Sequence, residues 1–181
     1  MQNFYRLESS KLGTFGVVWK EDNNQKKVVK IFLPKNKNNL LLKIKEEYPS
    51  AKKSNSLNEF IYEIMRFLSG EIIKFNLELL DFSICTDFQK KVLFADFNIP
   101  RGYVSTYSRI AKSTGVPNGA RAVGNALVTN PFPLVIPCHR VVRADGSLGG
   151  FGGGFEMKKR LLEAEGIILS KGKVTLDKIY N

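Results

Sequence analysis

Cysteine and histidine are scarce in this 181-residue chain, which contains two cysteines, Cys85 and Cys138, and a single histidine, His139. Two thiols close at most one bridge, so a fold held together by several disulfides is excluded. A structural zinc site takes more Cys and His ligands than the chain supplies, so we expect no metal. The adjacent residues 138 and 139 are therefore the place to look for cysteine chemistry.

Long apolar stretches are absent as well. No run of residues approaches the roughly 20 apolar positions that a helix needs to span a bilayer. The first ten residues, MQNFYRLESS, lack the basic start and apolar core of a secretory signal peptide. We therefore expect a cytoplasmic protein with reduced thiols and no membrane partner.

Acidic residues are in short supply, since 17 Asp and Glu accompany 28 Lys and Arg and the net charge is +11. Such an excess favours a polyanionic partner, of which nucleic acid is the commonest. Between residues 97 and 155, six basic side chains accompany a single acidic one, Asp145. This segment is typical of contact with phosphates, and a merely solvated basic surface is the alternative.

The N-terminal part begins with the pattern of β-strands. Residues 14–20 and 27–33 are rich in β-branched and aromatic residues. They flank residues 21–24, a polar and turn-prone stretch, and this arrangement predicts a β-hairpin.

Helical patterns follow the hairpin. A short helix is expected over residues 40–48, and the spacing of apolar residues predicts another over 57–70 that ends at Gly70. Residues 77–82 suit a last strand or a connector. We place the boundary between two lobes near residues 81–86.

From this boundary onward the pattern is mostly helical. Thr86 can cap a helix that ends before Pro100. A second helix is expected over 108–113, and Asn118 can cap a third over 119–128. Helix, short glycine-containing turn and helix form the outline of a helix-turn-helix. The whole chain is thus predicted to have an α/β fold in two lobes.

The most informative stretch is residues 130–142, NPFPLVIPCHRVV, where the only histidine directly follows a cysteine. A thiol is a strong nucleophile only as the thiolate, and a neighbouring imidazole can promote its ionisation. Adjacent residues rarely point the same way, so His139 is expected to reach the thiol through a water molecule. A Cys-His dipeptide alone is a weak indication, because a buried Cys beside a chance His is common.

Residues 137–141, PCHRV, resemble the active-site signature of the O6-alkylguanine-DNA alkyltransferases, also called methylated-DNA–protein-cysteine methyltransferases. Similar elements occur in the same order across residues 86–170: GYVSTY at 102–107, GARAVG at 119–124, NP at 130–131, GGFGGG at 149–154 and LLEAEG at 161–166. Residues 1–85 match the family only in outline.

The resemblance implies a fold and an activity. Residues 1–83 would form a ribonuclease H-like lobe with a small, mainly antiparallel sheet, and residues 84–181 a mostly helical lobe for DNA binding and alkyl transfer. The activity would be a single, irreversible transfer of an alkyl group from O6-alkylguanine in double-stranded DNA to Cys138. The base would flip out through the minor groove. No cofactor is expected, and the protein would be a monomer; activity on O4-alkylthymine and cooperative binding to DNA stay open.

Family roles carry over to matching residues. Cys138 would accept the alkyl group as a thioether, His139 would act as the base, Glu165 would orient that histidine, and Asn130 would brace the active-site turn. Tyr107 would crowd the target phosphate and assist rotation of the nucleotide. The expected DNA contacts are Gln89, Tyr107, Ser108, Ala120, Arg121 and Gly124. The expected walls of the base pocket are Pro133, Val141, Phe151, Gly152 and Gly153.

Arg121 would fill the gap that the flipped nucleotide leaves in the duplex. The backbone carbonyls of Cys138 and Val141 would accept from the guanine amino group, and amides near Gly152 would donate to O6. Many relatives have a tyrosine at the position of Phe151 and a serine at that of Gly152. The missing serine hydroxyl puts one contact to the base in doubt.

Three other classes of protein compete with this interpretation. An alkyltransferase-like protein that senses lesions without repairing them lacks the acceptor cysteine, whereas Cys138 is present here. A helix-turn-helix transcription factor would favour long polar side chains for base readout. A Cys-His hydrolase would turn over repeatedly. Transfer of label from alkylated DNA to protein, limited to one per chain, separates all three.

Overall fold

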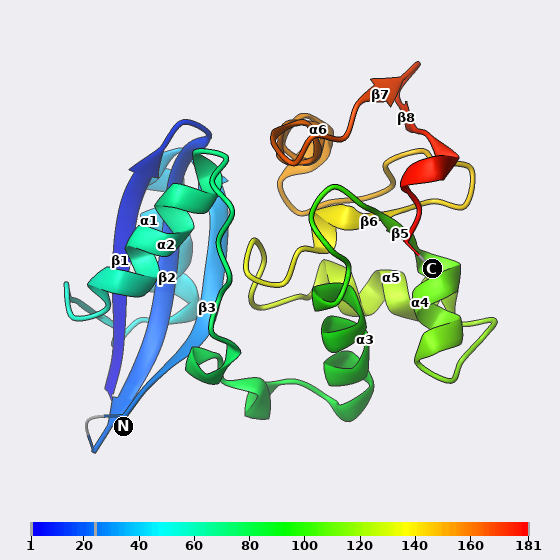
Figure 1. Cartoon of the computed structure of the whole chain (residues 1–181). Coiled ribbons are helices and arrows are strands. Elements are labelled where there is room, and N and C mark those ends of the chain that lie inside the picture. The colour runs from blue at the N-terminus through cyan, green and yellow to red at the C-terminus, as the bar shows by residue number, and fades with distance from the viewer. Residues whose placement is uncertain (1, 24, 181) are drawn as a thin grey trace. The chain divides into compact units, whose positions relative to one another are not determined.

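The computed structural model describes residues 2–23 and 25–180 (Figure 1). The chain divides into two compact units. The first contains Met1–Ile84 together with Pro131–Pro133, and the second contains Cys85–Asn130 and Leu134–Asn181.

The first unit is built on a four-stranded sheet in the order β3-β2-β1-β4. Strands β1 (Gln2–Ser10), β2 (Gly13–Asp22) and β3 (Gln25–Lys35) are antiparallel neighbours, and the short β4 (Lys52–Lys53) runs parallel to β1. The small, mainly antiparallel sheet is thus confirmed, and β2 and β3 form the predicted hairpin. Asn24, in the expected turn, lies outside the described residues. Strand β1 was not predicted.

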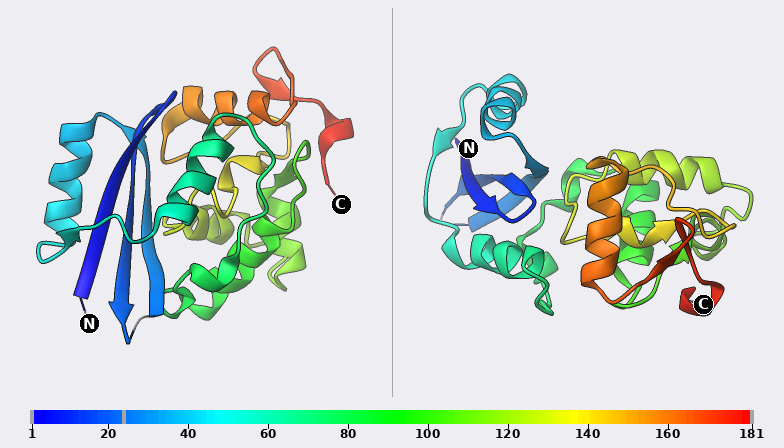
Figure 2. Two further views of the ribbon diagram at one scale, coloured as in Figure 1. Left: turned by 60° about the vertical axis from the view of Figure 1, so that its left-hand side comes forward. Right: turned by 90° about the horizontal axis from the view of Figure 1, so that it is seen from above.

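Helices α1 (Lys37–Glu47) and α2 (Asn58–Leu68) lie on opposite faces of this sheet (Figure 2). Both faces of β2 are therefore buried, and residues Phe15 to Trp19 along it are inaccessible. Gly16 allows α1 to approach closely, because a Cβ at that position would lie 2.9 Å from Cδ1 of Ile44. Gly70, just beyond α2, has φ +100°, as expected for a residue that ends a helix.

The segment Pro131–Pro133 packs into the first unit although most of its sequence neighbours belong to the second. Its attachment is specific. The backbone N–H of Ile31, in β3, donates to the carbonyl of Pro131 at 2.8 Å. The rings of Phe132 and Phe82 meet edge to face with centroids 5.3 Å apart. Residues 77–84 form two short 3-10 turns, Leu77–Leu79 and Phe82–Ile84, so they act as a connector.

The second unit is mostly helical. It contains α3 (Asp87–Phe97), α4 (Tyr107–Ser113), α5 (Ala120–Val128) and α6 (Gly154–Ala164). Thr86 caps α3 as predicted, since its hydroxyl accepts from the backbone N–H of Gln89 at 3.2 Å. The predicted cap of α5 is wrong. A turn in which Gly119 N–H donates to Val116 O moves the N-cap to Gly119, one residue beyond Asn118.

Short elements join these helices. Strand β5 (Ser105–Thr106) pairs in parallel with β6 (Val141–Val142), and β7 (Leu169–Ser170) pairs with β8 (Lys173–Val174). A 3-10 turn, η3 (Cys138–Arg140), precedes β6, and another, Leu176–Lys178, lies near the end of the chain. The core beneath them consists of Val104, Val142, Leu148, Leu162, Ile167 and Val174. None of the helices in the described part of the chain is long and apolar enough to cross a membrane.

Candidate active site

The backbone around Cys138 is fixed by a tight local network. The side-chain amide of Asn130 donates to the carbonyl of Ile136 at 3.2 Å, and the N–H of Cys138 donates to the same carbonyl at 2.9 Å. Leu134, within this turn, has φ +76°, in the left-handed region that a leucine adopts only when its surroundings enforce it. Leu134 is 1% exposed, so packing supplies that enforcement. Asn130 thus braces the turn that presents Cys138.

The Cys138 thiol is almost enclosed, with 8% of the residue exposed. Burial first, and then the negative charge of Asp96, raise the pKa of this thiol to about 12, although a hydrogen bond with Asn130 and the charge of Lys158 oppose the rise. The resting sulfur is therefore protonated at neutral pH. A base has to remove its proton before it can act as a nucleophile.

A candidate for that base is next to it in the sequence. Nε2 of His139 lies 2.9 Å from Oε1 of Glu165, and both side chains are buried. Burial lowers the pKa of His139, against the opposing influence of Glu165. The imidazole is therefore mainly neutral at pH 7. With Nε2–H donating to the carboxylate, the lone pair that can accept a proton is on Nδ1.

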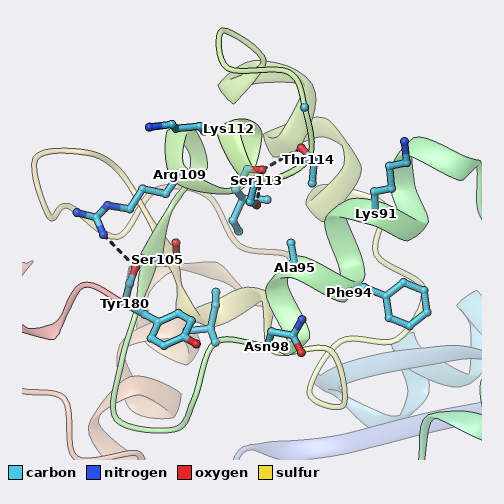
Figure 3. Close-up of a pocket in the computed structure, with 13 residues that line it drawn as sticks. Lys91, Phe94, Ala95, Asn98, Ser105, Arg109, Lys112, Ser113, Thr114 and Tyr180 are labelled. Atoms are coloured by element: carbon cyan, nitrogen blue, oxygen red, sulfur yellow. Dashed lines mark hydrogen bonds between the residues drawn. The ribbon is translucent and has the colours of Figure 1, made fainter.

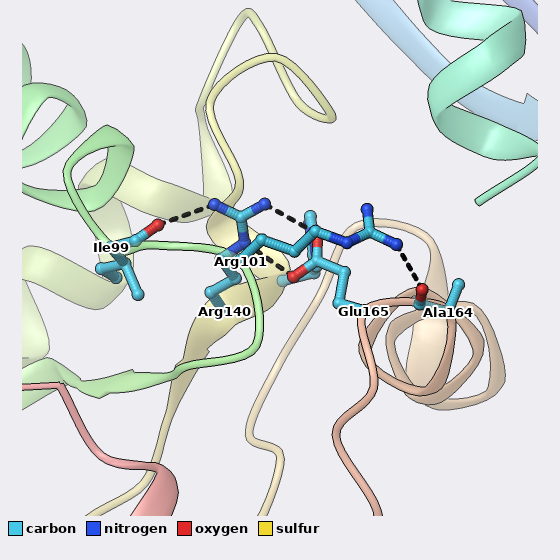
Figure 4. Close-up of polar contacts among 6 residues, drawn as sticks. Ile99, Arg101, Arg140, Ala164 and Glu165 are labelled. Carbon is cyan, nitrogen blue, oxygen red and sulfur yellow. Dashed lines mark hydrogen bonds and ion pairs between the residues drawn. The ribbon is translucent and has the colours of Figure 1, made fainter. Parts of the chain in front are cut away.

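Glu165 is held in place from its other side by Arg140 (Figure 4). Nε and Nη2 of Arg140 donate to the two oxygens of Glu165, each at 2.8 Å, and Nη1 donates to the carbonyl of Ile99 at 2.7 Å. Arg101 also donates to the backbone of Ala164, next to Glu165. Burial raises the pKa of Glu165, but the bonds and charges of His139 and Arg140 outweigh it and lower that pKa to about 2. Glu165 is thus a fixed negative charge behind His139.

Tyr107 lies at the start of α4 and contacts the glycine-rich loop at residues 149–154. Its hydroxyl donates to the carbonyl of Gly150 at 3.4 Å. Gly149 has φ +69°, and a Cβ there would lie 3.0 Å from the Tyr107 hydroxyl oxygen. On α5, a Cβ at Gly124 would lie 3.9 Å from the Tyr107 ring. Burial and the charge of Cys138 raise the pKa of Tyr107, so the phenol keeps its proton.

Lys158 of α6 was not predicted as a site residue, yet it is wholly buried and its charge acts on the Cys138 thiol. Its ammonium group donates to the carbonyl of Val141 at 2.6 Å and to that of Gly150 at 3.3 Å. Burial lowers its pKa to about 8, although the charges of Cys138 and Asp96 oppose that change. Lys158 therefore ties β6 to the glycine-rich loop and supplies positive charge near Cys138. The Val141 carbonyl, expected to accept from guanine, already accepts from this lysine.

The remaining predicted pocket residues are distributed along the loop and the turn. The Phe151 ring meets the His139 ring edge to face, with centroids 6.4 Å apart. A Cβ at Gly153 would overlap the sulfur of Met157, so a side chain at this position requires Met157 to shift. Gly152 is exposed. Pro133 belongs to the first unit and is buried within the chain.

The predicted DNA contacts lie on or near the helix-turn-helix. Arg121 is exposed in the first turn of α5, just after the half-buried Ala120, and Ser108 is exposed on α4. The side chain of Gln89, on α3, makes hydrogen bonds within the protein. Its amide donates to the carbonyl of Ala126 at 3.2 Å and to the hydroxyl of Thr129 at 3.0 Å, and so ties α3 to the end of α5.

A groove of about 1280 Å³ runs between α3, α4 and the end of the chain (Figure 3). The cations Lys91, Arg109 and Lys112 line it together with Phe94 and Tyr180. The described residues that line it include no carboxylate side chain. Part of the basic segment expected from the sequence is thus concentrated beside the helix-turn-helix. Within the described residues, no group of three or more His, Cys, Asp or Glu residues is placed to hold a metal ion.

Comparisons with known proteins identify the family. Residues 87–167 match the family model described as 6-O-methylguanine DNA methyltransferase, DNA binding domain. The chain is 42% identical over 154 residues to the methylated-DNA–protein-cysteine methyltransferase of Methanothermobacter thermautotrophicus, a match that covers 85% of this chain and 80% of the relative. The chain belongs to the methylated-DNA–protein-cysteine methyltransferase family.

Solved structures of this family share the fold. The O6-methylguanine methyltransferase of Mycobacterium tuberculosis superposes with a TM-score of 0.72 at 30% identity and covers 91% of this chain and 93% of its own. A structure of the mycobacterial protein in complex with DNA gives a TM-score of 0.74 at 30% identity, covering 90% and 92%. The predicted membership of the methyltransferase family and the α/β fold are therefore confirmed.

Proposed function

We propose that this methyltransferase repairs O6-alkylguanine in double-stranded DNA by moving the alkyl group once, and irreversibly, to the sulfur of Cys138. The observation that carries the proposal is the buried Cys138 followed by a buried His139 whose ring is held by Glu165 at 2.9 Å. Two findings support DNA as the partner: this chain matches the DNA-binding domain of the family, and a mycobacterial relative has been solved in complex with DNA.

The protonation states of the side chains in the site give each of them a part in the transfer. His139 takes the thiol proton, through a water molecule, and Glu165 stabilises the imidazolium that forms. The sulfur electron pair bonds to the alkyl carbon as the carbon–O6 bond breaks and its electrons pass to the guanine. Tyr107, which keeps its proton, donates a hydrogen bond to the purine while negative charge develops there. The guanine then takes up a proton, which the imidazolium of His139 returns through water, so that neutral guanine is restored in the DNA and Cys138 is a thioether.

If the damaged nucleotide flips out of the duplex, residues of the helix-turn-helix take part in that step. Arg121, exposed at the start of α5, occupies the gap that the extruded nucleotide leaves. Ala120 and Gly124 keep this helix narrow enough for the minor groove. Lys91, Arg109 and Lys112 attract phosphates, and binding therefore weakens with salt, with a log–log slope of about −0.9 for each phosphate contact.

A label-transfer experiment tests the proposal. The protein is incubated with a duplex that carries O6-methylguanine with an isotopically labelled methyl group, and the labelled residue is located by peptide mass spectrometry. The label is expected on Cys138 and on no residue of Cys138→Ser, while Cys85→Ser behaves as the parent. Label on Cys85 would overturn the assignment. Lesion binding without any transfer would indicate a lesion sensor instead of a repair protein.

A further inference from the structure

Asp96 is a buried acid for which the transfer described above has no use. It is 0% exposed, and neither of its carboxyl oxygens has a hydrogen-bond partner among the described residues. Buried carboxyl groups are normally paired, because an unpaired one loses its hydration without compensation. Its place on α3 explains the burial, since Asp96 follows Val92 and Leu93 on the face that is packed inward. An unpaired acid in such a place calls for a functional explanation.

The groups around Asp96 belong to the candidate active site. Helix α3 packs against η3, which contains Cys138 and Arg140. The charged and titratable groups whose fields reach Asp96 are Cys138 and Arg140 from η3, Tyr107 from α4, Lys158 from α6 and Glu165 at the end of α6. The acid is thus within electrostatic range of the thiol and of the groups that surround it.

Neither nearby cation makes a hydrogen bond to this carboxyl. Arg140 directs three of its nitrogens at Glu165 and at the carbonyl of Ile99. Lys158 donates to the carbonyls of Val141 and Gly150. An ionised Asp96 would therefore be a bare negative charge close to the place where Cys138 must become a thiolate. Two buried anions close to each other raise each other's pKa.

We propose that Asp96 is a positioning residue for the reaction of Cys138, a neutral buried carboxylic acid whose loss of a proton suppresses formation of the thiolate. The proposal rests on the proposed function in so far as alkyl transfer is the reaction that Cys138 performs. Asp96 acts on the Cys138 thiol and not on His139. The charges that change the pKa of His139 are those of Glu165, Arg140 and Lys158.

A pH dependence follows. Burial raises the pKa of Asp96 to about 8, while Arg140 and Lys158 hold it down and Glu165 raises it. Below that pH the acid is neutral and leaves Cys138 undisturbed. Above it the new charge raises the pKa of the thiol. The reactivity of an ordinary cysteine rises with pH, whereas that of Cys138 should level off above about pH 8, where Asp96 gains its charge and Lys158 loses its own. Replacing Asp96 by asparagine removes only the contribution of the acid.

Asp96→Asn, which mimics the neutral acid at every pH, tests this inference. The control is Asp87→Asn, the same change on an exposed aspartate of the same helix. Two rates are measured for each protein from about pH 6 to about pH 10, a range that brackets the pKa of a free thiol. The first is alkylation of Cys138 by iodoacetamide, followed on its own peptide. The second is transfer from free O6-benzylguanine.

The asparagine variant should match the parent near pH 6.5 and react about three- to ten-fold faster near pH 9.5, since one pKa unit is a tenfold change in thiolate fraction. Asp87→Asn should follow the parent throughout. Parallel pH profiles for the parent and Asp96→Asn would overturn the inference. Failure of transfer with the iodoacetamide difference intact would refute the proposed function and leave the role of Asp96 standing.

A measurement on the unaltered protein keeps the inference testable if Asp96→Asn does not fold. Infrared spectroscopy detects the carbonyl stretch of a protonated carboxyl group. One such band should persist at neutral pH and disappear as pH rises through about 8, where the gain in thiol reactivity stops. Absence of the band at neutral pH would contradict a neutral Asp96.

Discussion

Nε2 of His139 lies 2.9 Å from Oε1 of Glu165, and neither side chain is exposed to solvent beyond a trace. The pair joins a group that can take a proton to a group that stays ionised, because the pKa of Glu165 is lowered to about 2. The second carboxylate oxygen accepts from Nε of Arg140 at 2.8 Å, so the carboxylate is held from two sides and in turn orients the imidazole. Nε2 of the imidazole is thus occupied by Glu165, and a proton from the thiol could be accepted only on Nδ1.

Glu165→Gln should slow alkyl transfer about 10- to 100-fold, a part of the 10²–10⁴ that a positioned general base contributes. The amide removes the charge that stabilises the imidazolium and leaves Arg140 without its anionic partner. Transfer from free O6-benzylguanine under single-turnover conditions measures the effect. Glu163→Gln, an exposed change two residues earlier in the chain, is the control and should react at the parent rate. Equal rates for the two variants would remove Glu165 from the mechanism.

Arg121→Ala should affect duplex DNA and free base differently. Extruding a nucleotide costs a few kcal/mol, and a side chain in the vacated gap offsets part of that cost, so transfer from duplex should slow about ten-fold or more. Transfer from free O6-benzylguanine requires no extrusion and should be unchanged. Lys112→Ala, which removes an exposed cation from α4, should weaken binding to DNA without this selective loss. Equal losses on both substrates would place Arg121 in the base pocket instead.

Gly149→Ala should disturb the Tyr107 site, whereas Gly150→Ala should not. Gly149 has φ +69°, and a Cβ there would lie 3.0 Å from the Tyr107 hydroxyl oxygen and 3.1 Å from its ring. A Cβ at Gly150 would have no atom of the described, non-adjacent residues within 4 Å. The strain of an alanine in the left-handed region is on the order of 1 kcal/mol or more. Thermal unfolding and transfer from free base should both show the difference, and identical behaviour of the two variants would contradict the contact.

Asp96→Leu should stabilise the fold at neutral and alkaline pH. The folded-state pKa of Asp96 is raised to about 8 from an ordinary 3.8. Below about pH 4 both folded and unfolded chains keep the proton; between pH 4 and 8 only the unfolded chain loses it, so stability falls as pH rises. Each pKa unit corresponds to about 1.4 kcal/mol, and we expect a gain of ~2–4 kcal/mol near pH 8 after relaxation.

Chemical unfolding over a series of pH values measures this gain. It should shrink toward pH 4, where the acid is neutral in both states. Asp87→Leu, on the exposed face of α3, is the control and should change stability little at any pH. A gain that does not vary with pH would show that packing, not the charge of Asp96, accounts for the effect.

Local patterns were sufficient to predict several elements. The hairpin was evident from β-branched residues on both sides of a polar turn, and α3 from Thr86 as its cap. Strand β1 was not, because its residues are half-buried almost throughout and its alternation of apolar and polar positions is limited to the four residues 5–8. The start of α5 was misplaced by one residue because a backbone turn at Val116, and not the Asn118 side chain, decides where the helix begins.

The candidate site was only partly accessible from the sequence. Cys138 and His139 are adjacent in the chain, and the family resemblance supplied Glu165 and Asn130. Arg140 is part of the same motif, yet its bonds to Glu165 depend on how α6 ends.

Asp96 and Lys158 could be identified as neighbours of the site only from the tertiary structure. Both lie at the helical spacing of buried apolar neighbours, Val92 and Leu93 for the acid and Leu161 and Leu162 for the lysine. That spacing places a charged residue on the inward face of its helix and is therefore a usable indication of a buried charge. It does not show that the charges of both groups act on the thiol, because α3 and α6 are far apart in the sequence.

The central claim is that one chain accepts one alkyl group on Cys138. The intact mass of the protein after incubation with an excess of duplex DNA containing O6-methylguanine tests it most directly. Every chain should gain the mass of one methylene unit, repair should stop when one lesion per chain has been consumed, and Cys138→Ser should gain nothing. Consumption of many lesions per chain, or binding of the lesion with the mass unchanged, would contradict the account.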